Sequence, residues 1–168
     1  MRSAGKARLE GRWKPVQSDD ITIRPAARDD VPAIIALLAD DPLGRTREDT
    51  GDPDIYLRAF DDMAAQGGNI ALVAERGGEI VGCLQLTMIP GLSRRGAKRG
   101  QIEGVRVSAA CRGLRIGERL IRHAIDIARA EGCGLVQLTS DVSRPDAHRF
   151  YERLGFVASH AGFKLALH

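Results

Sequence analysis

The spacing of apolar and polar residues divides most of the chain into short strands and helices. Alternating or continuous apolar runs rich in β-branched residues predict strands at 21–24, 70–75, 79–89, 101–107, 135–139, 156–159 and 163–167. Apolar residues at helical spacing predict helices that begin near Asp29, span 53–66, run from about 114 to 131, and run from 145 to 155. Helices that alternate with strands are typical of an α/β domain.

Length and composition are those of one folded domain. The 168 residues are 43% hydrophobic and 28% charged, enough to bury a core. Residues 1–18 are basic and polar, so we expect a flexible N-terminal tail before a single domain at 19–168.

The stretch 101–120 leads from a strand through a glycine-punctuated turn into a helix. Such a turn presents free backbone N–H groups and the positive end of the helix dipole, the usual features of a phosphate site. Gly113 and Gly117 leave room for an anion, and Arg112 and Arg115 add positive charge. Taken alone, the same turn is equally consistent with an ordinary strand-to-helix connection and solvated arginines.

A second motif lies at 144–156 and reads Arg-Pro-Asp-Ala-His-Arg-Phe-Tyr-Glu-Arg-Leu-Gly-Phe. Together the two motifs resemble those of the GNAT superfamily of acyl-CoA-dependent N-acyltransferases, over residues 21–168. The resemblance implies a mixed, twisted sheet of about seven strands, flanked by about four helices. Its two central parallel strands, here those with Val105 and Leu138, would splay apart around the pantetheine arm of acetyl-CoA. Arg115 replaces the usual middle glycine of the loop, so we expect the turn to keep this residue in the right-handed region.

The resemblance also implies site residues for an acetyltransferase that moves an acetyl group directly from acetyl-CoA to a primary amine in a ternary complex. Glu103 would accept the amine proton, and Tyr151 would protonate the departing thiolate. Gly104 indicates a bulge that frees a backbone N–H at or next to Val105 for the thioester carbonyl. The expected cofactor-binding residues are Val105, Arg106, Val107, Arg112, Gly113, Leu114, Arg115, Ile116, Gly117, Ala147 and Phe150.

Structural roles remain open for these residues. Glu103 could face solvent or pair with Arg106, with water taking the proton instead. Tyr151 could be a core aromatic of an amphipathic helix. Cys111 and the four histidines show neither ligand spacing nor a catalytic pairing, so we expect structural roles and no metal.

Charge and cysteine content narrow the partners and the location. A net charge of +3 and few aromatic residues argue against binding to nucleic acid. The basic loop at 93–99 leaves nucleic-acid binding as a third alternative. No apolar run is long enough to span a membrane, and three unpatterned cysteines are typical of a reduced, cytoplasmic protein.

The acceptor and the assembly state are predicted only in outline. Acids outnumber arginines over residues 40–62, which favours a small cationic amine or is simply a solvated surface. Terminal strands often pair across dimers in the GNAT family, so a homodimer is expected. The alternative function is a non-catalytic acyl-CoA-binding sensor or partner subunit.

Overall fold

The computed structural model describes residues 14–18, 20–40, 48 and 51–167. In chain order the elements are β1 (Val16–Ser18), β2 (Ile21–Pro25), η2 (Arg28–Asp30), α1 (Val31–Ala39), α2 (Pro53–Gln66), β3 (Asn69–Arg76), β4 (Glu79–Ile89), α3 (Ser93–Gly96), β5 (Lys98–Val107), η4 (Ala109–Cys111), α4 (Ile116–Ala130), β6 (Cys133–Leu138) and α5 (Pro145–Arg153).

One mixed sheet of six strands, in sequence order, organises the described chain. Neighbouring strands from β1 to β5 are antiparallel, and β5 and β6 are parallel. The β3–β4 hairpin turns at Gly77 and Gly78, whose φ angles of 58° and 85° suit glycine. A parallel pair needs a crossover, which α4 supplies between β5 and β6.

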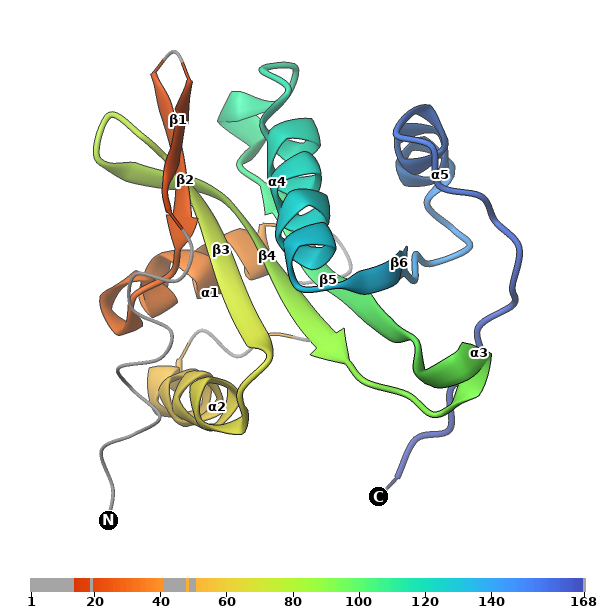
Figure 1. Cartoon of the computed structure of the whole chain (residues 1–168). Coiled ribbons are helices and arrows are strands. Elements are labelled where there is room, and N and C mark those ends of the chain that lie inside the picture. Colours follow the sequence, from red (N-terminus) through yellow and green to blue (C-terminus); the bar gives the residue numbers. More distant parts are fainter. Residues whose placement is uncertain (1–13, 19, 41–47, 49–50, 168) are drawn as a thin grey trace.

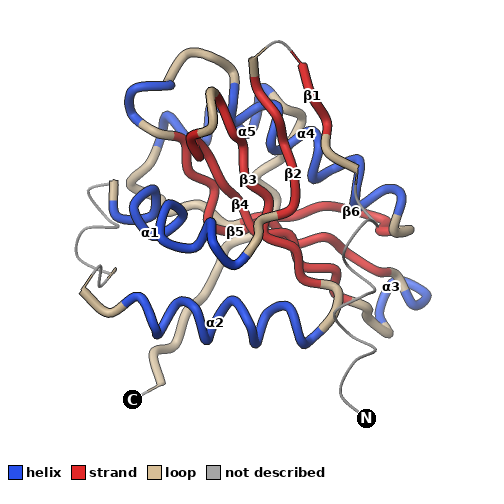
Figure 2. Tube along the Cα trace, turned by 90° about the vertical axis from the view of Figure 1, so that its left-hand side faces the viewer, coloured by secondary structure: helices blue, strands red, loops and turns tan. Residues whose placement is uncertain are grey.

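Helices cover both faces of the sheet. Helix α4 packs on one face, while α1 and α2 lie on the other (Figures 1 and 2). The larger core lies under α4, where Leu120 and Ile121 meet Leu72, Leu86 and Ile102. A smaller cluster of Leu37, Val73 and Cys83 lies under α1. Because strand side chains alternate between faces, the two clusters fix which residues of each strand point to α4.

Strand β5 carries two irregularities that shape the middle of the molecule. Its pairing with β6 ends at Ile102 and Leu138, although β5 continues to Val107. Its pairing with β4 shifts by one residue between Gln85–Glu103 and Cys83–Arg106, and Gly104 there has φ 62°. The expected bulge and the expected divergence of the two parallel strands are therefore both present.

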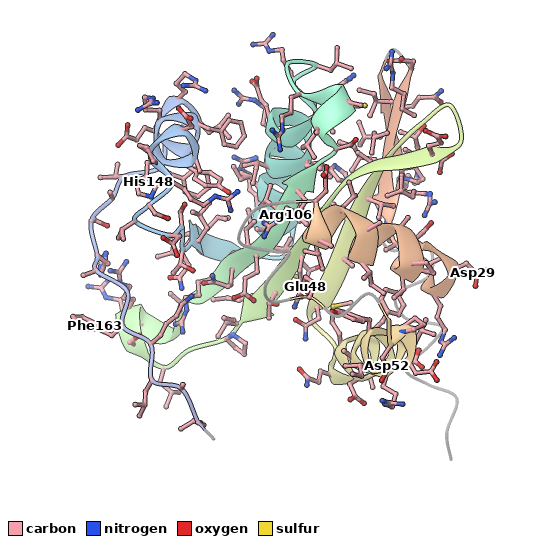
Figure 3. All side chains as sticks on the ribbon, turned by 180° about the vertical axis from the view of Figure 1, so that it is seen from behind. Asp29, Glu48, Asp52, Arg106, His148 and Phe163 are labelled. Carbon is pink, nitrogen blue, oxygen red and sulfur yellow. The ribbon has the colours of Figure 1, made fainter. Side chains whose placement is uncertain are left out.

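The predicted terminal hairpin is not formed, which removes two of the seven predicted strands, while the unpredicted β1 adds one, so that the described residues form six strands. Residues 156–167 form no strand. Phe163, Leu165 and Leu167 are 95%, 86% and 89% exposed. Figure 3 shows Phe163 on the C-terminal segment, beyond the edge of the sheet. Alternation alone cannot hold a two-stranded unit, which needs a packing surface to be stable.

At the other end of the sheet, Val16–Ser18 pair with β2, so the sheet begins inside the segment predicted as a tail. The rest of that prediction, at 1–13, lies outside the described residues.

Candidate active site

The predicted proton acceptor lies next to the bulge of β5. Glu103 is exposed, and its carboxylate forms no hydrogen bond or ion pair with any described residue. The ion pair with Arg106 that would explain Glu103 structurally is absent in the described part of the chain. The Arg106 guanidinium instead donates to the Val105 carbonyl at 2.9 Å. A carboxylate held at a bulge without a partner is available to a substrate amine.

The bulge is held from the neighbouring strand. The Cys83 thiol donates to the Gly104 carbonyl at 3.7 Å. Burial raises the pKa of Cys83 to about 12, so it stays a neutral donor. Past Ile102, β5 has no partner strand on its β6 side, so this edge could pair with an added strand-like ligand.

The turn before α4 presents backbone N–H groups in the way phosphate sites require. The Arg119 N–H donates to the Arg115 carbonyl at 3.1 Å, which makes Arg115 the N-cap. The N–H groups of the first turn, from Ile116 to Glu118, therefore have no intrahelical acceptor. A side chain at Gly113 would meet nothing within 4 Å, so the approach to the turn is open. The Leu114 N–H is directed instead at the Cys111 carbonyl, at 3.4 Å.

The backbone of Arg115 corrects one expectation. It has φ 58° and ψ 18°, in the left-handed region, and not the right-handed conformation expected for a residue that replaces glycine. This conformation costs an L-residue roughly 1–2 kcal/mol. The turn keeps the shape that glycine would give it, and the surrounding fold sustains the strain.

Arginines dominate the charge around this helix start. The segment 112–122 contains one carboxylate, that of Glu118, and four arginines: Arg112, Arg115, Arg119 and Arg122. Glu118 accepts from Arg115 at 3.1 Å and from Arg122 at 3.0 Å, and these arginines, Arg122 first, lower the pKa of Glu118. The N-terminal end of α4 is therefore positive in both its side chains and its dipole.

Tyr151 lies on α5, across from β5. Its ring makes edge contacts with Phe150 and Phe156, with centroids 5.2 and 5.9 Å apart. Its hydroxyl forms no hydrogen bond with a described residue. Burial raises the pKa of Tyr151, while the charges of Arg144 and Arg106 act in the opposite direction, so both guanidinium groups lie near the phenol. Figure 3 shows Arg106 between α5 and α1, in the middle of the molecule.

Three predicted cofactor-binding residues come together between α4, α5 and β5. A Cβ on Gly117 would lie 3.5 Å from Cζ of Phe150 and 3.5 Å from Cγ2 of Val107. Ala147 lies one turn before Tyr151 on α5, and both are half-buried. The two motifs, separated along the chain by α4 and β6, thus meet at the open end of β5.

Three acidic residues of the 40–62 segment bond to other groups of the protein. Asp52 caps α2 through the Asp54 N–H, and Asp61 pairs with Arg28. Glu48 accepts from the Tyr56 hydroxyl at 2.9 Å. The part of this segment at 41–47 and 49–50 lies outside the described residues. These bonds weaken the prediction that the acids of this segment attract a cationic amine.

Sequence reasoning missed a row of uncharged polar side chains across the sheet. Asn69, Thr87, Gln101 and Gln137 are consecutive cross-strand partners on β3, β4, β5 and β6. The signal was present, because each of these residues alternates with apolar ones. It was not read because register between distant strands is not visible in sequence.

Comparison with known proteins agrees with this geometry. Residues 32–156 match the sequence profile of the acetyltransferase (GNAT) family. The chain belongs to this family. It is 39% identical to the aminoalkylphosphonate N-acetyltransferase of Salmonella typhimurium over 95 residues, which are 56% of this chain and 61% of that enzyme. It is 35% identical to the glucosamine 6-phosphate N-acetyltransferase of Trypanosoma brucei brucei over 116 residues, 67% of this chain and 76% of that enzyme.

A solved structure of similar shape has a different description. The crystal structure of a transcriptional regulator from Bacillus halodurans C-125 superposes with a TM-score of 0.85 at 48% identity, over 88% of this chain and 99% of that one. Shared fold and high identity place both chains in one family. They do not establish that the two proteins have one function.

The described residues contain no group of three or more His, Cys, Asp or Glu side chains that could hold a metal ion. None of the helices described is long and apolar enough to cross a membrane.

Proposed function

We propose that this protein transfers an acetyl group from acetyl-CoA directly to a small primary amine, in a ternary complex. The observation that carries the proposal is the convergence at the end of β5. An unpartnered carboxylate, an open strand edge and a positive helix start lie around one bulge. Acetyl transfer to an amine needs a proton acceptor, a held thioester and a bound pyrophosphate, and each has a candidate there.

The predicted residues of the bulge, the turn before α4 and helix α5 have different roles in this proposal. Glu103 takes the proton of the ammonium, directly or through water. A backbone N–H of the bulge at or next to Val105 polarises the thioester carbonyl. The turn from Arg112 to Gly117 holds the pyrophosphate, and Tyr151 gives a proton to the sulfur. Tyr151 suits this role because its raised pKa keeps the phenol protonated at neutral pH.

The acceptor is proposed as a small amine whose nitrogen is cationic before it reacts. Both curated relatives are named for amines of this size, an aminoalkylphosphonate and glucosamine 6-phosphate. A polyamine or aminoglycoside would find fewer carboxylates to pair with in the 40–62 segment, because Glu48, Asp52 and Asp61 already bond within the protein.

A non-catalytic acyl-CoA sensor is the second candidate. It is supported by the similarity to the chain described as a transcriptional regulator. Turnover separates the two proposals, since a sensor would bind acetyl-CoA without releasing thiol in the presence of amines.

Two further parts of the proposal are a cytoplasmic location and a homodimer. The cysteines Cys83, Cys111 and Cys133 are all free, which agrees with a reducing cytoplasm. The exposed apolar segment around Phe163 suits pairing with a second copy, and light scattering of the purified protein would test a homodimer.

The test of the cofactor site is a calorimetric titration with acetyl-CoA. Gly113→Glu places a carboxylate where the pyrophosphate is expected, so binding should be lost. Gly132→Glu is the matched control, because Gly132 also has a positive φ, an open surrounding and a place at the other end of α4. Binding in the control but not in Gly113→Glu supports the site. A wild-type protein free of bound CoA that does not bind acetyl-CoA refutes the function.

A further inference from the structure

Three polar side chains of β5 share the sheet face that turns away from α4. A Cβ on Gly100 would lie 3.2 Å from Cβ of Ala128 on α4, and Ile102 belongs to the core under that helix. Because side chains alternate along a strand, Arg99, Gln101 and Glu103 all point to the opposite face. This face carries a cation at one end of the row, a carboxamide in the middle and a carboxylate beside the bulge.

The middle of this row is neutral and already hydrogen-bonded. The Gln137 amide donates to the Gln101 carbonyl oxygen at 2.8 Å, and the Thr87 hydroxyl donates to Asn69 Oδ1 at 2.5 Å. Gln85, opposite Glu103, donates to Thr87 at 3.3 Å. The row therefore offers uncharged polar contacts between two opposite charges.

Arg99 lacks the partner that a half-buried guanidinium normally has. Its cross-strand neighbours are Ile89 on β4 and Leu135 on β6, both apolar. Its Nε is buried and has no hydrogen-bond acceptor in the described part of the chain, and no ion pair of Arg99 is formed there. A buried donor without an acceptor is costly. The terminal nitrogens of Arg99 also have no hydrogen-bond partner among the described residues, and they are not buried, so an anion can bind the guanidinium through them.

The surroundings of Arg99 favour an anion over any other ligand. Arg94 and Arg95 of α3 precede it in the chain and are exposed, and the Lys98 ammonium donates to the Glu131 carbonyl. One Arg99 Nη lies 3.6 Å from the position of a Cβ on Gly91, so the guanidinium is directed toward the end of β4, away from Glu103.

We propose that this face binds the acceptor, with Arg99 holding an anionic group, a phosphate or a carboxylate, while the amine reaches Glu103. The inference rests on the proposed acetyl transfer and adds its substrate class: an elongated amine with an anion at the far end. Four residues of strand separate the Cα atoms of Arg99 and Glu103 by roughly 13 Å, and Arg99 leans outward. A short amino acid therefore cannot contact both ends, whereas a longer one can.

The test is calorimetric binding of matched ligands to the CoA complex, in which no transfer occurs. The long pair is 8-aminooctanoate and 8-aminooctan-1-ol, and the short pair is β-alanine and 3-aminopropan-1-ol. Wild-type protein should bind the long acid about 10–100-fold more tightly than the long alcohol, as expected for a charged hydrogen bond to a guanidinium. Arg99→Gln should remove that preference without changing the affinity for the alcohol. The short pair should show no dependence on Arg99.

Arg95→Gln is the matched control, since it removes one exposed cation from the same region. If Arg99→Gln and Arg95→Gln weaken the binding of the long acid equally, Arg99 contributes only to the overall positive charge of the region, and the proposal is overturned. Failure of the wild type to prefer the long acid would overturn it as well. Failure of the proposed acetyl transfer gives a different result: the ligands bind with the expected selectivity, but no thiol is released from acetyl-CoA.

Discussion

Replacing Tyr151 with phenylalanine separates the proposed chemistry from packing. The change removes one oxygen atom and keeps the ring contacts with Phe150 and Phe156 at 5.2 and 5.9 Å. The hydroxyl has no hydrogen-bond partner among the described residues, so its loss leaves no group unsatisfied. We expect the free energy of unfolding to change by no more than about 0.5 kcal/mol.

The same change should lower turnover strongly. A positioned general acid contributes roughly 10²–10⁴-fold, so kcat should fall within that range. The dissociation constant for acetyl-CoA should stay within about twofold, because the proposed contact is to the sulfur in the departing state. The assays are thiol release under saturating acetyl-CoA, calorimetry for binding, and urea denaturation for stability.

The pH profile provides a readout that packing would not change. Burial raises the pKa of Tyr151, so the protonated phenol persists through pH 10 and is lost only as the pH rises through the folded-state pKa. The wild-type rate should fall on this alkaline side, and Tyr151→Phe should lack that limb. In stability terms the raised pKa favours the folded state below pH 10, and this contribution is lost above the folded-state value.

Tyr56→Phe is the matched control, because Tyr56 is the other of the two tyrosines and its hydroxyl donates to Glu48 at 2.9 Å. It should cost about 1 kcal/mol of stability and leave kcat unchanged. The role of Tyr151 would be refuted if Tyr151→Phe kept full turnover. It would also be refuted if the fall in kcat came with an equal loss of acetyl-CoA affinity.

Three further predictions concern the bulge and the fold. Glu103→Gln should lower kcat/KM by about 10²–10⁴-fold in the thiol-release assay, with no change in thermal midpoint beyond the reproducibility of the measurement. Full activity of this variant would contradict the role of Glu103 and indicate that water takes the amine proton. Gly104→Ala and Gly77→Ala should each lose roughly 1–2 kcal/mol in urea unfolding, since both glycines have φ near 60°, but only Gly104→Ala should slow transfer. Hydrogen bonding to Arg24 lowers the pKa of Asp30, so this pair stabilises the fold above pH 3.8 and the contribution disappears as the pH falls through the lower folded value. Asp30→Asn should therefore flatten the acid limb of the stability curve, and an unchanged limb would contradict that reasoning.

The local elements were accessible from sequence because their signals are local. The helix at 53–66 was predicted with the bounds that α2 has, from its apolar spacing and the glycines behind it. The strand at 79–89 likewise matches β4. The predicted C-terminal strands failed for the opposite reason. A strand exists only when another strand or a surface pairs with it, and 156–167 find none among the described residues.

The candidate site was only partly accessible. The turn at 112–117 could be proposed as a phosphate site because its glycines and helix start are contiguous, although the left-handed conformation of Arg115 differs from the one expected. The resemblance pointed to Glu103 and Tyr151. The sequence places Arg99 in a basic loop, because nothing in the sequence shows that its cross-strand neighbours are apolar.

By itself the sequence determined the order of helices and strands and the two motifs of the family. These depend on residues a few positions apart, whose spacing sets which side chains share a face. Only the tertiary structure decided where β5 loses its parallel partner β6, and that Arg99, Gln101 and Glu103 share the sheet face opposite α4. Those features depend on register between strands far apart in the chain, and register is set by which buried side chains pack together in the folded molecule.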